Sequence, residues 1–391
     1  MHKYKEFILI FFLFLFLGAL LLPVTNLWID RYRIFNAFNH HYDTYYWRKD
    51  NKWEFNHADR IIPMAFLLSN KHEFDSFIFG NSKIGNMDVR SLGASWYKLN
   101  YNSGNMVEHL HNAKLLLDNI HVKNIILTID LEYFYDLSIN VKYKKDVYPK
   151  DMGEWAVLLK KYLFKREDEK DFNFLFEKDY ELIKKEEFYI RTNANHLVPY
   201  DKNAEHLSYV NNLTGLRYKD STFDQKKIDQ VIGMIRELKT LTEIKGAHFS
   251  MLFVPFHYKN IFQADPDKIN YIKRELVSIS DFYDFSLPHN YIINNAFWRE
   301  TFHYTKAVND EIIKKIKNEK QLCEPFGVLL TKNNIDTQLE TGYNTSRGLI
   351  DYLLISDSHF FPHKNFRNGV ENSDIFSTNL HQITQNCLDY Y

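Results

Sequence analysis

Short apolar runs alternate with amphipathic stretches over two parts of this 391-residue chain. The run Asn124–Asp130 is apolar between polar flanks, which is typical of a strand buried on both faces of a sheet. Residues 228–244 place apolar side chains on one stripe at helical spacing, and Gly246 is the expected stop. The repeated order of strand, helix and strand predicts an α/β fold with a doubly wound, mostly parallel sheet. The predicted strands are Phe74–Phe79, Tyr97–Asn100, Asn124–Asp130, Phe249–Val254 and Phe282–Phe285, and the predicted helices are Met106–Asn119, Ile228–Ile244, Ile269–Ile279 and Tyr304–Ile316.

An uncharged apolar run near the start of the chain, Phe7–Val24, has about the length that a bilayer core requires. A cleaved signal peptide is the alternative, but no small-x-small cleavage site follows, and Trp28 suits a membrane interface. The basic residues on the two flanks do not decide the orientation. We expect residues 1–28 to form an uncleaved single-pass anchor, with the bulk of the chain outside the cytoplasm, in the periplasm or an equivalent space.

The α/β pattern extends over residues 29–130 and 225–336, which we predict to form one domain. Residues 131–224 interrupt it with a charged, Tyr- and Phe-rich stretch that we expect to be helical. An insertion of this length after a strand is typical of a cap or a binding wall. Residues 337–391 are polar and show no period, and the sequence assigns them no role.

Composition removes several classes of function. The chain has 49 basic and 50 acidic residues and a formal net charge of -1, so we predict no nucleic-acid binding. Aromatic residues make up 16% of the chain, and Gly and Pro are scarce, as expected of a folded protein. Cys323 and Cys387 could form one disulfide or none, and no Cys/His spacing typical of a metal site is present. We expect neither a metal nor a cofactor.

Two short segments more than two hundred residues apart carry the parts of an activated nucleophile. Ser82 follows an apolar run that ends in Gly-Asn-Ser, which predicts a strand tip that presents a hydroxyl group. His303 lies just before a predicted helix, and Glu300 precedes it by three residues. In a parallel sheet these groups could meet at the carboxyl edge. His303 would then take the proton of Ser82, Glu300 would orient the imidazole, and the amides of Ser82 and Gly104 would hold the oxyanion.

These motifs resemble the SGNH (GDSL-like) hydrolase superfamily. Gly80-Asn81-Ser82 is similar to its Gly-Asp-Ser block, Asn102-Ser103-Gly104 to its glycine block, and Glu300-Thr301-Phe302-His303 to its Asp-x-x-His block. The resemblance covers roughly residues 7–336 and, with the anchor, is greatest to membrane-anchored, extracytoplasmic members. It implies an SGNH/flavodoxin-like fold and a role in O-acetylation of alginate and other polysaccharides, or in D-alanylation of cell-wall polymers. A multi-pass membrane acyltransferase is the partner that it implies.

The sequence departs from that family at three points. Asn81 stands where the hydrolases usually have Asp, and Glu300 replaces the Asp of the last block. The strand that should precede a Gly-x-Asn-Asp block ends instead in Thr128-Ile129-Asp130, which leaves the asparagine donor to the oxyanion unassigned. Asn81, Asn102 and Asp130 are the candidate residues for the rim of the site.

The resulting prediction is a serine-dependent O-acyl (acetyl) transferase or acylesterase with a Ser-His-Glu triad, acting on cell-envelope or secreted polysaccharide. Transfer and hydrolysis share an acyl-enzyme, so the sequence does not choose between them. The alternative is a catalytically silent, membrane-anchored module that binds glycan or partner proteins in a polysaccharide modification or export machine.

Overall fold

The structure is a computed structural model of the whole chain. It describes residues 2–29, 61–101 except 86, 104–135, 147–163, 224–257, 260, 265–293 except 288, 297–298, 302–322 and 326–342. The chain forms two compact units, of which one contains Met1–Glu73, His111–Ile120 and Asn140–Thr192 and the other contains the rest. The predicted tail beyond 342 and most of the predicted insertion lie outside the described residues.

The first unit contains the long N-terminal helix α1 (His2–Ile29), α3 (Ile62–Ser69) and α6 (Met152–Leu163). Within α1, Tyr4–Leu21 is long and apolar enough to span a membrane, and none of its side chains is buried. Leu158 of α6 is buried together with Ile61 in a small apolar cluster of this unit. Trp155, also on α6, and Tyr148 pack against this cluster. The described part of the predicted insertion is therefore helical, while its predicted role as a cap stays a prediction.

The second unit is built on a six-stranded sheet with strand order β2-β1-β3-β4-β5-β6. All neighbouring strands pair in parallel except β5 and β6, so the predicted α/β fold with a mostly parallel sheet is confirmed. The order of the first five strands reverses between β1 and β3, which is the flavodoxin-like topology. The strands are β1 (Ser76–Asn81), β2 (Trp96–Tyr101), β3 (Asn124–Ile129), β4 (His248–Phe253), β5 (Phe282–Asp284) and β6 (Val328–Leu330).

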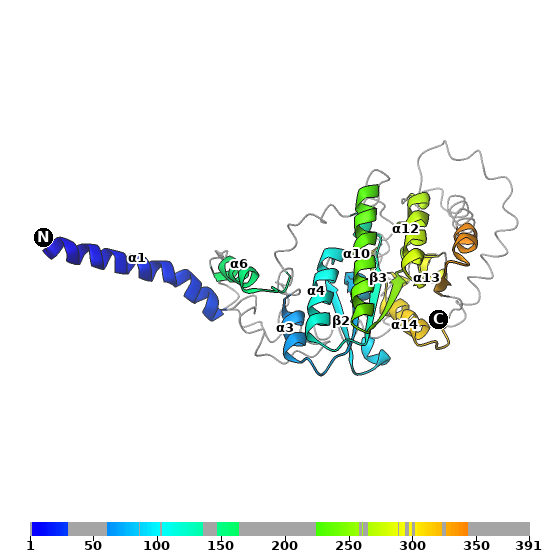
Figure 1. Cartoon of the computed structure of the whole chain (residues 1–391), viewed down its shortest axis with the longest axis horizontal. Helices are drawn as coiled ribbons and strands as arrows, with labels where there is room; N and C mark the ends of the chain where they lie inside the picture. The colour runs from blue at the N-terminus through cyan, green and yellow to red at the C-terminus, as the bar shows by residue number, and fades with distance from the viewer. Residues whose placement is uncertain are drawn as a thin grey trace, which may run out of the picture. The chain divides into compact units, whose positions relative to one another are not determined.

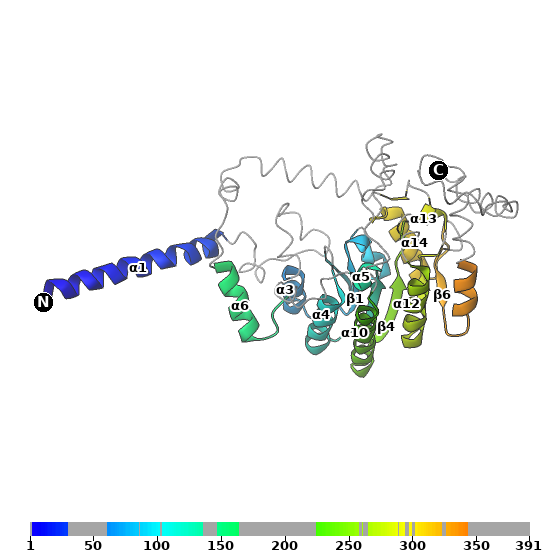
Figure 2. The ribbon, with the colours of Figure 1, turned by 90° about the horizontal axis from the view of Figure 1, so that it is seen from above.

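Helices cover both faces of this sheet, as doubly wound folds require. Helices α10 (Gln225–Ile244) and α12 (Pro266–Ile279) lie side by side on one face (Figure 1), and α14 (Lys306–Ile316) lies on the opposite face (Figure 2). Their N-terminal amides are capped where the sequence offers a carboxylate: Asp224 accepts from Lys226 N, and Asp265 accepts from Asp267 N. The remaining elements are α4 (Met106–Asn119), α5 (Glu132–Tyr135), α13 (Asn290–Ile293) and the 3-10 turns η1 (Ser82–Ile84) and η2 (Val89–Leu92).

Two sequence predictions about the sheet need correction. The first strand runs over Ser76–Asn81 and not Phe74–Phe79, so Ser82 follows its last residue directly. The sequence also predicts five strands, whereas the described sheet has a sixth, β6, which pairs antiparallel with β5 at the edge. With three residues and a Leu329 side chain that is 42% exposed, β6 has neither the length nor the alternation that identifies a strand from sequence.

Candidate active site

The tip of β1 sets the position of Ser82. Every residue of this strand is buried, and Asn81 then caps the short turn η1 by accepting a hydrogen bond from Lys83 N at 3.0 Å. Gly80 is required just before the turn, because a Cβ atom there would lie 2.2 Å from Thr128 Oγ1 on the neighbouring strand. The turn η1 begins directly after the strand, and Ser82 at its first position is partly exposed.

Ser82 and His303 are brought together across 221 residues of sequence. The Ser82 Oγ atom lies 2.7 Å from His303 Nε2, the distance of a strong hydrogen bond. His303 precedes α14, whose N-cap residue is Thr305. A hydroxyl group within hydrogen-bond distance of an imidazole nitrogen is the arrangement in which the histidine can act as general base.

The site lies where the sheet topology predicts a ligand. Ser82 follows β1 and Asp130 follows β3, and these two strands flank the point where the strand order reverses. Ligands of open α/β sheets bind outside the carboxyl ends of the strands at this switch point. The fold and the Ser82–His303 contact thus indicate the same edge of the sheet.

Two of the predicted site residues, Glu300 and Asn102, lie outside the described residues. The acid of the predicted triad, and one predicted rim residue, stay predictions.

The predicted oxyanion donor Gly104 lies beside the nucleophile strand. A Cβ atom at Gly104 would be 3.3 Å from the carbonyl oxygen of Gly80. Its own N–H, however, donates to the carbonyl oxygen of Tyr101 at 3.1 Å. This amide is therefore engaged in its local turn and would have to leave Tyr101 to bind an oxyanion. The next residue, Asn105, caps α4 through its Oδ1 atom, and its buried Nδ2 atom has no hydrogen-bond partner among the described residues.

Asn81 and Asp130 do not line a rim, contrary to the prediction, because both are almost completely buried. Asn81 Nδ2 donates to Asp130 Oδ2 at 2.7 Å, and Lys83 Nζ lies 2.8 Å from the same carboxylate oxygen. The other oxygen, Oδ1, accepts from the Glu132 amide at the start of α5. Parallel pairing of β1 with β3 places these carboxyl ends side by side, and that proximity allows the charges to pair in the interior.

Sequence reasoning missed Lys83. Lysine is rarely buried, and a Lys directly after a candidate nucleophile is most simply interpreted as a surface residue. The only available signal was the carboxylate of Asp130 at the end of the adjacent strand.

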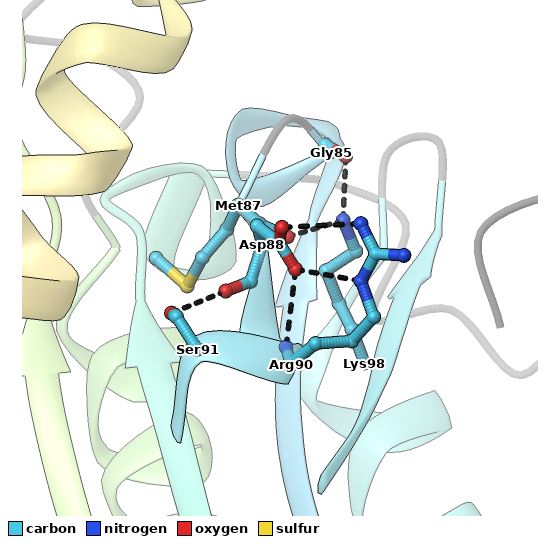
Figure 3. Close-up of polar contacts among 6 residues, drawn as sticks. All are labelled: Gly85, Met87, Asp88, Arg90, Ser91 and Lys98. Atoms are coloured by element: carbon cyan, nitrogen blue, oxygen red, sulfur yellow. Dashed lines mark hydrogen bonds and ion pairs between the residues drawn. The ribbon is translucent and has the colours of Figure 1, made fainter. Parts of the chain in front are cut away.

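The chain beyond η1 is held by side chains from its surroundings (Figure 3). Lys98, on β2, donates through Nζ to the carbonyl oxygens of Gly85 at 2.6 Å and Met87 at 2.9 Å. Further along, the Arg90 guanidinium donates to both carboxylate oxygens of Asp88, each at 3.1 Å. The segment that follows Ser82 is thus tied to the neighbouring strand rather than left as an open loop.

Two buried tyrosines, Tyr304 next to His303 in the chain and Tyr133 on α5, have raised pKa values. Burial, and next to it the charge of Asp130, raises the pKa of Tyr304 well above the usual tyrosine value. The same two causes raise the pKa of Tyr133, whose hydroxyl lies 3.0 Å from His109 Nε2. The Trp298 ring packs edge-on against both Tyr304 and the buried His257. Tyr304, directly after His303 in the chain, is thus packed in the interior next to Trp298.

The described part of the chain contains no group of three or more His, Cys, Asp or Glu side chains that could hold a metal ion. Neither Cys323 nor Cys387 belongs to this part, so their pairing stays undecided.

No protein-family model matches the sequence, and a comparison with curated proteins finds no match. Among solved structures, the chain is similar to that of a Bacteroides fragilis NCTC 9343 protein described as a "putative acylhydrolase". The TM-score is 0.32 at 10% sequence identity, over 69% of this chain and 89% of the other. A likeness at this level says nothing about the activity of this chain, which must be argued from the site itself.

Proposed function

We propose that this chain is a serine-dependent O-acyl (acetyl) transferase or acylesterase that acts on a cell-envelope or secreted polysaccharide. The observation that supports acyl chemistry is the 2.7 Å contact between Ser82 Oγ and His303 Nε2 at the carboxyl edge of a parallel sheet. Nucleophile and base come from opposite ends of the α/β unit, so the contact is a product of the fold and not of local sequence.

The reaction would proceed in two halves. His303 Nε2 accepts the Ser82 proton while Oγ bonds to the carbonyl carbon of an ester, and the carbonyl oxygen becomes an oxyanion near the Ser82 amide. The intermediate then expels the alcohol, which takes the proton from His303 and leaves an acyl-enzyme. A sugar hydroxyl or a water molecule then attacks this ester while His303 takes its proton. The bond from the acyl carbon to Ser82 Oγ breaks, and His303 returns the proton to Ser82, which completes transfer or hydrolysis. In this proposal Glu300 orients the imidazole.

The N-terminal helix supports the proposed substrate class. If α1 anchors the chain, Ser82 is confined near a membrane surface, and a tether suits an immobile polymer better than a freely diffusing ester. An activated acyl group made inside the cell would need a route across the bilayer. A multi-pass membrane acyltransferase is the partner that could deliver it.

One observation favours a second candidate function, a catalytically silent glycan- or partner-binding module. The Gly104 amide donates to Tyr101, which leaves the Ser82 amide as the one predicted oxyanion donor not occupied within the described structure. Loss of a single oxyanion donor can lower kcat by about 10²–10³. A protein with the Ser82–His303 contact but without the second oxyanion donor could bind its partner and yet turn over no ester.

The decisive test compares the full-length chain in detergent micelles with Ser82→Ala, using p-nitrophenyl acetate and an active-site fluorophosphonate. Wild type should hydrolyse the ester and carry one phosphonyl group on Ser82, as located by peptide mass spectrometry. Ser82→Ala should lose on the order of 10³-fold or more in kcat/KM and take no label. Ser278→Ala is the matched control, because this hydroxyl on α12 is exposed and donates only to the Glu275 carbonyl oxygen.

The same assay separates the two functions. Equal turnover by wild type and Ser82→Ala, with no label on Ser82, would refute the enzymatic proposal. Retention of polysaccharide by such an inactive protein would instead support the binding module. If the enzyme is active, adding an oligosaccharide acceptor should reveal acetylated sugar by mass spectrometry for a transferase, and no change for an esterase.

A further inference from the structure

The residues on either side of Ser82 are anchored to one buried carboxylate. Asn81 and Lys83 both contact Asp130 Oδ2, at 2.7 and 2.8 Å, while Ser82 between them faces His303. We refer to Asn81, Lys83 and Asp130 as the Asp130 cluster. None of its members is more than 3% exposed.

The Asp130 cluster joins the carboxyl ends of three adjacent strands. Asn81 ends β1, Asp130 follows β3, and the Lys83 ammonium lies 4.1 Å from the ring centroid of Phe256, just after β4. Asp130 is itself fixed by the Glu132 amide. Both carboxylate oxygens of Asp130 are therefore held in place by hydrogen bonds or ion pairs. Through Asn81 and Lys83, they fix the turn that carries Ser82 to the end of the sheet.

Stability alone is a weak reason for such an arrangement. Removing two charges from water carries a large desolvation penalty, and replacing a buried ion pair by apolar residues is often neutral or stabilising. The Asp130 cluster lies directly behind a side chain whose position must be correct to a fraction of an ångström for proton transfer. Misplacement by about 1 Å can lower a rate by about 10²-fold.

We propose that Asp130 is a positioning residue that orients Ser82 toward His303 by holding Asn81 and Lys83 on either side of it. The inference rests on the proposed acyl-transfer function. Asp130 does not touch the reacting atoms. It acts through the backbone of η1. An asparagine in its place has one acceptor oxygen instead of two, so either the Asn81 Nδ2 group or the Glu132 N–H would lose its acceptor.

The protein contains a matched control for this cluster. Lys273 and Asp284 form a second buried ion pair at 2.7 Å, also with the ammonium near a phenylalanine ring, that of Phe253. This pair binds Ser286 and joins α12 to β5, which β3 and β4 separate from β1. Replacing Lys273 and Asp284 removes one buried ion pair, as replacing Lys83 and Asp130 does. Neither Lys273 nor Asp284 contacts the residues that flank Ser82.

The experiment uses full-length protein in micelles and compares Lys83→Met/Asp130→Asn with Lys273→Met/Asp284→Asn. Active sites are counted by stoichiometric fluorophosphonate labelling, so that kcat per labelled serine is independent of the folded fraction. The first double variant should lose 10- to 100-fold in kcat per site with KM within about twofold of wild type. The control variant should keep its kcat per site within about threefold, even if its melting temperature falls further.

Unchanged kcat per labelled site in Lys83→Met/Asp130→Asn would overturn the positioning role, and so would equal losses in the two double variants. If the first variant does not fold, Asn81→Ala keeps the ion pair and should still lower kcat per site about tenfold, while an unchanged value would again overturn the inference. Failure of the proposed function is distinguishable, because then wild type itself would show no serine-dependent turnover.

Discussion

The substitution Gly80→Ala tests how tightly the nucleophile strand is packed. The added Cβ atom would lie 2.2 Å from Thr128 Oγ1 and 2.7 Å from Ile84 Cδ1, both well inside van der Waals contact. Ile84 is fully buried, and Thr128 donates a buried hydrogen bond to the Phe79 carbonyl oxygen at 2.9 Å. Neither neighbour can move without disturbing the end of β1 or the turn that carries Ser82.

The magnitude follows from these two contacts. Overpacking a well-filled core destabilises by about 1–3 kcal/mol, and displacing Thr128 gives up a buried hydrogen bond of about 1 kcal/mol. We therefore expect Gly80→Ala to lower the free energy of unfolding by about 2–4 kcal/mol. Urea titration of the full-length chain in micelles, followed by tryptophan fluorescence, measures this loss.

Two further variants make the reasoning refutable. Thr128→Ala removes the atom in closest contact, so Gly80→Ala/Thr128→Ala should lose less stability than the sum of the two single losses. Gly233→Ala, the same substitution at an exposed position of α10 with no atom within 4 Å of the new Cβ, should stabilise by up to about 1 kcal/mol. A Gly80→Ala protein as stable as wild type, or strict additivity with Thr128→Ala, would contradict the close packing at the tip of β1.

Three other predictions test the charges and the anchor. Lys83→Met alone leaves the buried Asp130 carboxylate without its ion-pair partner and should lower the free energy of unfolding by about 3–5 kcal/mol in urea titrations. Lys123→Met, at an ion pair whose lysine side chain is 61% exposed, should lower it by less than about 1 kcal/mol. Similar losses in the two variants would refute the role of burial. Burial and the charge of Asp130 raise the pKa of Tyr304, so the folded state keeps a proton that the unfolded chain releases above about pH 10. The free energy of unfolding should therefore fall as the pH rises beyond about 10, and Tyr304→Phe should make that fall shallower. If Tyr4–Leu21 is an uncleaved anchor, the mature protein should keep its N-terminus and stay in the membrane pellet through alkaline carbonate washing, and its release by the wash would contradict an integral span.

Much of the sheet unit could be predicted from the sequence because its signals are local. Helix α4 has the predicted bounds Met106–Asn119, and the main parallel strands begin and end within two residues of the predicted positions. Apolar runs and helical stripes are properties of neighbouring residues, so they survive whatever the tertiary arrangement turns out to be. The contact between Ser82 and His303 was also within reach, since parallel strands place their carboxyl ends at one edge.

The tertiary structure alone decided what lies behind that contact. Whether Asp130 lies at an exposed rim or in a buried ion pair depends on its being adjacent to Lys83, which follows from the pairing of β1 with β3. The addition of β6 to the sheet likewise depends on a partner outside its own segment, the strand β5. Hydrophobic periodicity determines which face of an element is buried, because it is encoded within the element. Charge pairing depends on which element tips become neighbours, and only the folded chain determines that.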